Sequence, residues 1–192
     1  MLYGAGMNAE HLEVCASDGW REALETIIVP YALADSKLGD DVLEVGPGPG
    51  LITDLLRRQL PKMTAVELDP DLASKLANRL AGSNVEVVNA DATDMPFEDG
   101  RFSGAVSFTM LHHVPTVMLQ NQLFTEVARV LRPGAVFVAS DSVASDDLAA
   151  FHHDDIYNPV DPSSVEQRLL DAGFTSADAR WNEFGWAATA VR

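Results

Sequence analysis

The chain has 192 residues, of which 47% are hydrophobic and 22% are charged, as expected for one globular domain with a sizeable core. A net charge of −16 repels phosphate backbones and anionic lipids, so we expect neither nucleic acid nor a membrane as a partner. The single cysteine, Cys15, cannot form an internal disulfide, and the N-terminus lacks the basic and apolar regions of a signal peptide, so we expect a cytoplasmic protein.

The N-terminal segment is expected to form a helical cap over residues 1–34. Residues 1–10 show no periodic pattern and are interpreted as an arm that is mobile or covers a ligand. From Trp20 onward, apolar residues recur at helical spacing through Leu24, Ile27 and Tyr31, which predicts an amphipathic helix with a kink at Pro30.

A short apolar run and a glycine-rich turn follow the cap. The run Val42–Val45 is β-branched and short, as is typical of a buried parallel strand, and the apolar spacing from Leu51 predicts a helix to about Gln59. Three alternating glycines therefore lie on a strand-to-helix turn. Because glycine has no Cβ, it adopts positive φ and lets a ligand approach the main chain closely.

The rest of the chain continues the alternation of strands and helices. Asp69-Pro70 and Asp161-Pro162 each predict a helix start with a capping aspartate and proline at the first helical position. The predicted elements are strands over 63–68, 85–88, 102–108, 135–139, 174–181 and 184–191, and helices over 70–81, 119–130 and 162–172.

Two stretches depart from this alternation. Residues 140–161 are rich in Asp, Ser and His without sustained periodicity, and the last two strands are too close for a helical crossover, so they should form an antiparallel hairpin. Together the elements predict one α/β domain over residues 1–192, a doubly wound three-layer sandwich.

Carboxylates follow the second and third predicted strands, at the edge where such sheets bind ligands. Glu67 comes 21 residues after Gly46, and Asp91 ends the third strand; these can bind ribose hydroxyls and an adenine amine. The turn reads G-x-G-x-G, with Leu51 in the place of the third dinucleotide glycine. Glu44 would oppose a pyrophosphate but suits a cationic ligand, such as a sulfonium with an amino group.

With these features the chain resembles the class I S-adenosylmethionine (SAM)-dependent methyltransferases, and specifically their small-molecule branch. The resemblance implies a Rossmann-like sheet of seven mostly parallel strands in the order 3-2-1-4-5-7-6, with an antiparallel last strand. It covers about residues 40–140 and is carried by five segments: Leu43–Gly50, Val66–Asp69, Asn89–Phe97, Phe108–Val114 and Ala128–Gly134.

The resemblance also implies a SAM site. Glu44 and the glycine turn would contact the methionine portion, and the Thr109 region would lie beside the sulfonium. The second and third strand ends would hold the ribose and the adenine. The implied SAM-binding residues are Glu44, Gly46, Pro47, Gly48, Gly50, Glu67, Leu68, Asp91, Ala92 and Thr109.

The methyl acceptor is interpreted as a small molecule. The glycine turn is also similar to that of the rRNA adenine dimethyltransferases, but those carry an Asn/Asp-Pro-Pro/Leu-Pro-Tyr type motif where this chain has residues 108–112 with the sequence Phe-Thr-Met-Leu-His. We expect transfer to a hydroxyl oxygen of a sugar or other aliphatic alcohol. The alternatives are carbon or nitrogen methylation of a small metabolite, a NAD-dependent oxidoreductase, and a non-catalytic cofactor-binding protein; a homodimer stays open.

An aliphatic hydroxyl needs a base or a metal to take its proton. The candidates for the base are His152, His153, Asp154 and His113, and Asp154 with Asp155 are candidate ligands for Mg²⁺. The competing interpretation of residues 151–157 is a solvated polar loop, because neighbouring side chains in an irregular loop need not converge.

Overall fold

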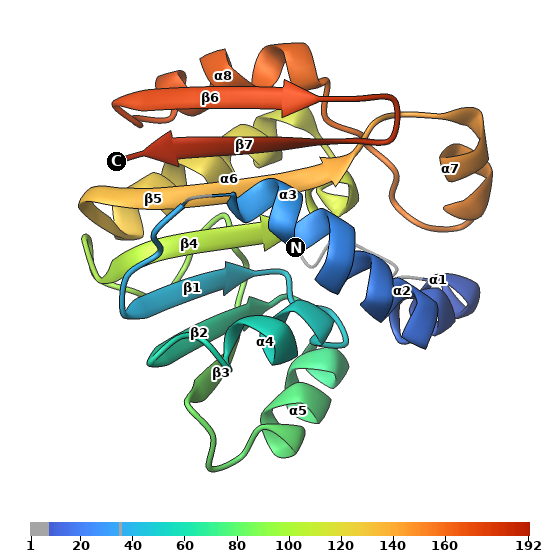
Figure 1. Ribbon diagram of the computed structural model, residues 1–192, viewed down its shortest axis with the longest axis horizontal. Coiled ribbons are helices and arrows are strands. Elements are labelled where there is room, and N and C mark those ends of the chain that lie inside the picture. The colour runs from blue at the N-terminus through green and yellow to red at the C-terminus, as the bar shows by residue number, and fades with distance from the viewer. Residues whose placement is uncertain (1–7, 35) are drawn as a thin grey trace.

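The computed structural model describes residues 8–34 and 36–192. Its centre is one seven-stranded sheet in the order β3-β2-β1-β4-β5-β7-β6 (Figure 1), which confirms the predicted strand order. The strands are β1 (Asp41–Val45), β2 (Lys62–Glu67), β3 (Val85–Asn89), β4 (Phe102–Phe108), β5 (Leu131–Ser142), β6 (Ser176–Trp181) and β7 (Gly185–Val191).

The first five strands run parallel, so their carboxyl ends share one edge of the sheet. β7 pairs antiparallel with both β5 and β6, which confirms the predicted C-terminal hairpin. The order reverses at β1, whose neighbours are β2 and β4. A cleft at the carboxyl edge beside β1 is where such sheets bind ligands.

Helices cover both faces of the sheet, as the three-layer prediction requires (Figure 1). α3, α4 and α5 pack on one face, and α6 and α8 pack on the other. The helices are α1 (Ala9–Cys15), α2 (Asp18–Ala23), α3 (Val29–Leu33), α4 (Leu51–Leu56), α5 (Pro70–Arg79), α6 (Val117–Val130), α7 (Asp146–Phe151) and α8 (Pro162–Asp171).

The two predicted Asp-Pro helix starts are confirmed. The Asp69 side chain accepts hydrogen bonds from the backbone N–H groups of Asp71 and Leu72 at the start of α5. Asp161 accepts one from the N–H of Ser163 at the start of α8. Each aspartate thereby satisfies N–H groups that have no partner inside the helix.

The N-terminal helical segment is divided into three pieces. α2 passes through a π-helical turn, Leu24–Ile28, into α3, which has Pro30 in its first turn. Proline has no N–H to continue the helical pattern, so the break lies just ahead of it. Residues 1–7 of the predicted arm lie outside the described residues, and the part from Ala9 onward forms α1. α1 and α2 lie beyond the carboxyl ends of the strands (Figure 1).

Two local predictions were incomplete. The segment 140–161 contains a six-residue helix, α7, which is too short to give a recognisable period. β5 begins at Leu131, ahead of the predicted start at Ala135. The pairing of β4 with β5 shifts register between Phe102 and Gly104, and this irregularity accommodates Pro133, which has no N–H for a regular ladder.

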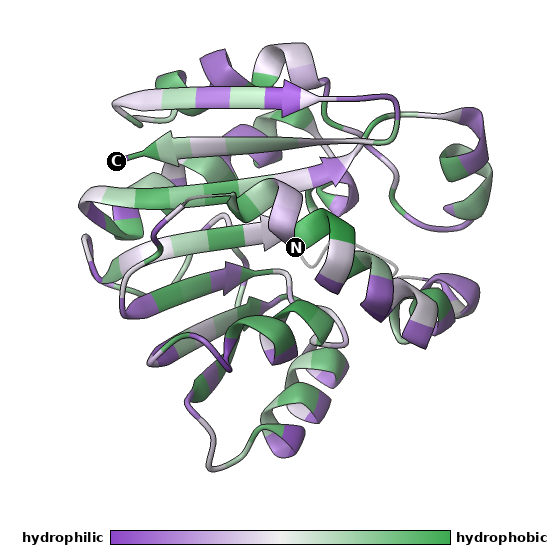
Figure 2. Cartoon of the chain, in the orientation of Figure 1, coloured by the Kyte–Doolittle hydropathy of each residue, from purple (hydrophilic) through white to green (hydrophobic). Residues whose placement is uncertain are grey.

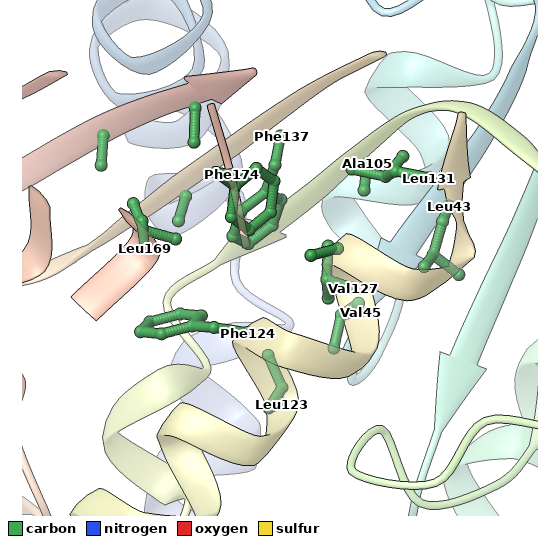
Figure 3. Packing of buried hydrophobic residues seen from close by; sticks show 14 of the residues in the cluster. Leu43, Val45, Ala105, Leu123, Phe124, Val127, Leu131, Phe137, Leu169 and Phe174 are labelled. Atoms are coloured by element: carbon green, nitrogen blue, oxygen red, sulfur yellow. The ribbon is translucent and has the colours of Figure 1, made fainter. Parts of the chain in front are cut away.

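The apolar side chains form the core on both faces of the sheet. Figure 2 shows hydrophobic residues in the central strands β1 and β4, and buried side chains of the helices pack against them on both faces. On one face α6 places Leu123, Phe124 and Val127 against the sheet, and the rings of Phe137 and Phe174 stack with centroids 5.8 Å apart (Figure 3). Among the helices of the described residues, none is both long and apolar enough to cross a bilayer.

A glycine in β4 fixes how closely the segment before β1 approaches the sheet. A Cβ added to Gly104 would lie 2.3 Å from the Leu38 carbonyl oxygen. We expect Gly104→Ala to lower the free energy of unfolding by about 2 kcal/mol or more, because backbone atoms must move. Urea unfolding measures the change.

The matched control is Gly19→Ala in α2, where an added Cβ meets nothing within 4 Å. That variant should gain about 0.5–1 kcal/mol from helix propensity. Equal unfolding free energies for the two alanine variants would contradict the close approach at Gly104.

Candidate active site

The glycine turn after β1 has a backbone that other residues rarely adopt. Gly46, Gly48 and Gly50 all have positive φ, at 68°, 52° and 88°. A Cβ on Gly46 would lie 2.2 Å from the Met110 side chain. The turn therefore combines a left-handed backbone with close packing against the segment after β4, and both features require glycine.

Glu67, at the end of β2, holds this turn in place. Its Oε2 accepts a hydrogen bond from the Gly48 N–H at 3.0 Å, and its Oε1 accepts one from the Asp69 N–H at 2.9 Å. Burial raises the pKa of Glu67 despite these hydrogen bonds. A carboxylate has about four acceptor positions, so both oxygens keep capacity for a ligand. The predicted ribose-binding residue is thus also a structural part of the turn.

Glu44, two residues before the turn, is buried at 2% exposure. Its Oε2 accepts a hydrogen bond from the Thr53 hydroxyl at 2.7 Å. Removal from water raises the pKa of Glu44 to about 7, because burial disfavours the charged form. A cationic group binding beside it would restore the carboxylate.

The third predicted carboxylate lies in a tight turn after β3. One oxygen of Asp91, Oδ1, accepts hydrogen bonds from the N–H and the hydroxyl of Thr93, at 2.8 and 2.7 Å. The other oxygen, Oδ2, makes none of the hydrogen bonds found among the described residues. That oxygen is the one left to receive a ligand donor.

These groups line one cavity of about 410 Å³ at the carboxyl edge of the sheet. Every residue of the predicted SAM set except Gly50 is part of its wall. Gly50 is buried next to α5, where an added Cβ would lie 2.4 Å from the Leu76 side chain. Thr109 takes positive φ (50°) and donates its N–H to the Ser140 carbonyl at 2.8 Å, which places the segment after β4 in the wall.

The N-terminal helices complete the cavity with mainly apolar side chains. Cys15, Trp20 and Leu24 form part of the wall, opposite residues that follow β4. Burial raises the pKa of the Cys15 thiol to about 11, so this cysteine is a protonated packing residue. The strand ends therefore contribute polar groups to the cavity wall, and the N-terminal helices contribute mainly apolar ones.

Four histidines gather beside the cavity, and His113 forms part of its wall. One ring nitrogen from each of His11, His112, His113 and His152 lies within 4.8 Å of the others. The ring centroids of His112 and His113 are 4.2 Å apart, and those of His11 and His152 are 4.7 Å apart. We call these four residues the histidine cluster.

Burial lowers the pKa of three of these imidazoles, those of His11, His113 and His152. Burial, and next the neighbouring imidazoles, lower the pKa of His113 to about 2. Burial likewise lowers the pKa of His11, although Asp155 opposes the shift, and it lowers the pKa of His152. These rings are therefore neutral near neutral pH and carry lone pairs.

The structure divides the predicted acceptor-side residues into two groups. His152 and His113 join the histidine cluster, whereas the side chains of His153 and Asp154 are exposed. Asp155 is the partner of His11, whose Nδ1 lies 2.9 Å from its Oδ2, and its other oxygen accepts the Asn8 N–H. The predicted Mg²⁺ ligands are therefore separated: Asp154 is exposed, and Asp155 contacts His11 and Asn8.

Sequence reasoning did not find two residues of this region. Asp141 lies near the end of β5, where its Oδ1 is 2.7 Å from the Nδ1 of His112; the strand-end rule that found Glu67 and Asp91 applies to it as well. His11 gives no such signal, because it lies in a short helix and meets Asp155 only across 144 residues of sequence.

Comparison with known proteins identifies the region around the glycine turn. The family model described as "Methyltransferase domain" matches residues 43–139. The chain is 36% identical over 125 residues to "Ribosomal RNA small subunit methyltransferase A" of Bifidobacterium longum subsp. infantis, covering 62% of this chain and 41% of that protein. It is 28% identical over 151 residues to "O-methyltransferase cnsE" of Penicillium expansum, covering 73% of this chain and 54% of that protein.

A solved structure matches over nearly the full length. The crystal structure of a SAM-dependent methyltransferase from Aquifex aeolicus superposes with a TM-score of 0.73 at 18% identity, covering 96% of this chain and 98% of that one. At this identity the match supports the fold. The chain spans about half the length of the two sequence relatives.

The buried carboxyl of Glu44 makes stability depend on pH. The pKa of Glu44 in the folded state, about 7, lies above the ordinary 4.5. The stabilisation of the fold by the protonated carboxyl is therefore fully present below pH 4.5 and is lost as the pH rises through about 7. We expect Glu44→Gln, which keeps an acceptor for Thr53, to exceed the wild type in free energy of unfolding by on the order of 3 kcal/mol above about pH 7.

The difference between Glu44→Gln and wild type should shrink towards about pH 5, as measured by urea unfolding across the range. Glu98→Gln, a change at an exposed carboxylate, is the control and should follow the wild type throughout. Parallel pH curves for Glu44→Gln and wild type would show that Glu44 has an ordinary pKa.

Proposed function

The chain belongs to the class I SAM-dependent methyltransferases, and on that premise we propose that it transfers the methyl group of SAM to a hydroxyl oxygen of a small molecule. In this reaction the bond between the methyl carbon and sulfur breaks and a bond between carbon and oxygen forms. The hydroxyl proton is released, and S-adenosylhomocysteine is the second product. The acceptor class is a sugar or another aliphatic alcohol.

The strand-end carboxylates support SAM as the methyl donor. SAM supplies a methyl group that is already activated by its positively charged sulfur. Glu44 lies beside the turn where a cationic amino acid group would be stabilised by a carboxylate. Glu67 has acceptor capacity for ribose hydroxyls, and Oδ2 of Asp91 has it for the adenine amine. All three carboxylates line the same cavity.

The observation that carries the acceptor assignment is the position of His113. Its ring forms part of the cavity wall, and its Nε2 is buried without a hydrogen-bond partner in the described residues. We assign it the role of accepting a hydrogen bond from the acceptor hydroxyl, which aligns the oxygen for in-line attack. Much of the rate of methyl transfer comes from such alignment of the two reactants.

Three features favour a small molecule over RNA. The cavity has a roof of apolar side chains from α1, α2 and the π-helical turn, including Trp20 and Leu24. The net charge is −16, which opposes binding of a polyanion. Residues 108–112 read Phe-Thr-Met-Leu-His, in the place where the rRNA adenine dimethyltransferases, by the resemblance described above, carry an Asn/Asp-Pro-Pro/Leu-Pro-Tyr type motif. One relative named as an O-methyltransferase supports oxygen as the accepting atom.

We propose that two segments select the acceptor. The described part of residues 1–34 supplies the roof, through Cys15, Trp20 and Leu24, and residues 140–161 supply Ile156 to the wall and place His152 at the end of α7. Both segments lie outside the residues matched by the family model. They are thus free to differ among relatives that share the SAM site.

The adenine contact gives a first test. Asp91→Asn keeps the Oδ1 acceptor for Thr93 but turns the free Oδ2 into an N–H donor, which would face the adenine amine. We expect the Kd for SAM to rise by about tenfold or more, as for loss of a hydrogen bond to a charged group. Isothermal titration calorimetry with SAM and S-adenosylhomocysteine measures it.

The control for that test is Asp94→Asn, an exposed carboxylate in the same loop, which should leave the Kd unchanged. If Asp91→Asn binds SAM as tightly as wild type, the adenine assignment is wrong. Binding of NAD in place of either SAM or S-adenosylhomocysteine would overturn the methyltransferase proposal as a whole.

The acceptor class is tested with SAM carrying an isotope-labelled methyl group. The panel contains sugars and aliphatic alcohols, each paired with the analogue in which an amine or hydrogen replaces the hydroxyl, and an rRNA transcript. We expect label on oxygen of a small molecule, detected by mass spectrometry. Label found on the amine analogues alone, or on the transcript alone, would contradict the proposal.

A further inference from the structure

The histidine cluster brings together segments that are far apart in the chain. The sequence has five histidines, and four of them meet at one place. His11 comes from α1, His112 and His113 from the 3-10 helix Leu111–His113, and His152 from the residue that caps the end of α7. Three of the four are at most 6% exposed: His11, His112 and His152.

Each of the four rings has its Nδ1 beside an oxygen acceptor. The Nδ1 atoms of His11 and His112 lie 2.9 Å from Asp155 and 2.7 Å from Asp141. Those of His113 and His152 lie 3.1 Å from the Ile156 carbonyl and 2.6 Å from the Leu148 carbonyl. Since carboxylate and carbonyl oxygens only accept, all four Nδ1 atoms carry the proton, and each Nε2 is left with a lone pair.

The Nε2 atoms of three of these rings are buried without a hydrogen-bond partner among the described residues. The Nε2 atoms of His112, His113 and His152 are buried and have no hydrogen-bond partner in the described part of the chain. Leaving a buried polar atom without a partner costs about 1–3 kcal/mol. Ordinary core packing does not account for three such atoms, all acceptors, within one cluster.

We propose that the histidine cluster is a binding site for a divalent transition metal ion of the zinc class. The four ring nitrogens lie within 4.8 Å of one another. In a tetrahedral site with metal–nitrogen distances of about 2.0–2.1 Å the ligand atoms are about 3.3 Å apart. Metal binding would therefore draw the ring nitrogens together from their present separations of up to 4.8 Å.

The chemistry of the donors selects the metal. Neutral imidazole is a preferred ligand of Zn²⁺, Cu²⁺, Fe²⁺ and Ni²⁺, whereas Mg²⁺ prefers oxygen and retains its water. Asp141 and Asp155 place two negative charges behind His112 and His11. A carboxylate behind a ligating histidine fixes the tautomer and strengthens the nitrogen as a donor. The two charges also offset those of a divalent ion.

The proposed metal site would connect α1 to the segment that follows β4 in the wall of the cavity. A metal bound to His11 and His112 would hold α1 against the segment that follows β4, and so fix the roof of the cavity. His113 Nε2 has one lone pair, which can either ligate the ion or accept the hydroxyl hydrogen bond of the proposed function. If the proposed function is correct and the other three imidazoles hold the ion, its fourth position would be open to the acceptor hydroxyl, whose pKa it would lower. Metal binding itself does not rest on the proposed reaction.

The test uses the full chain without a histidine tag, stripped with EDTA and dialysed. Calorimetric titration with ZnCl₂ should show one ion per chain, and CoCl₂ should give the intense visible absorption of tetrahedral Co²⁺. Zn²⁺ at a hundredfold excess over its Kd should raise the Tm by about 5 °C or more. MgCl₂ should produce none of these effects.

The variants separate the cluster from other sites. His152→Ala should raise the Kd for Zn²⁺ at least a hundredfold and abolish the Co²⁺ absorption. Asp155→Asn removes the carboxylate charge behind His11 and leaves all four imidazoles in place, and it should raise the Kd by about 10–100-fold. His153→Ala is the matched control, because its ring is exposed outside the cluster, and should bind Zn²⁺ as the wild type does.

Circular dichroism and SAM calorimetry on each variant report whether it is folded, independently of metal. Should His152→Ala be unfolded, anomalous scattering from Zn²⁺-soaked crystals of the wild type decides by showing the ion on at least three of the four imidazoles. Absence of Zn²⁺ and Co²⁺ binding by a wild type that binds SAM would overturn the metal site alone. Full binding in His152→Ala, or its loss in His153→Ala, would overturn it equally.

Discussion

The hydrogen bond between the Glu67 carboxylate and the Gly48 N–H determines the shape of the ligand site. It ties the end of β2 to the turn after β1, and the second oxygen of Glu67 holds the start of the next loop through Asp69. A turn of three positive-φ residues has many other conformations available to it. Because one buried carboxylate restricts the turn from the neighbouring strand, the floor of the cavity is formed before any ligand arrives.

The roof of the cavity is attached in a different way. The floor belongs to the sheet and shares its apolar core, whereas α1 is joined to the rest through His11, Asn8 and their contacts with Asp155 and the α7 segment. Polar contacts of this kind depend on the protonation and ligation of their members. Under the proposed function, the methyl donor would contact the sheet edge and the acceptor would contact the cap held by these polar contacts.

Negative charge is distributed consistently over this edge of the molecule. Glu44, Glu67 and Asp91 line the cavity proposed to hold the cationic methyl donor, and Asp141 and Asp155 stand behind two imidazoles. Burial raises the pKa of Glu44. Binding of a cation beside Glu44 must therefore also offset the free energy of ionising this carboxyl. The same acidic edge disfavours a polyanionic acceptor.

The sequence by itself determined the sheet, the glycine turn and the positions of Glu67 and Asp91. These follow from local patterns, because parallel strands of a doubly wound fold bring their carboxyl ends to one edge whatever the loops do. Only the tertiary structure decided that His11 and His152 join His112 and His113 while His153 faces solvent. That outcome depends on how two short helices, α1 and α7, pack against each other although more than a hundred residues of sequence separate them. A helix of six or seven residues has too few turns for the spacing of its apolar residues to show which face is buried.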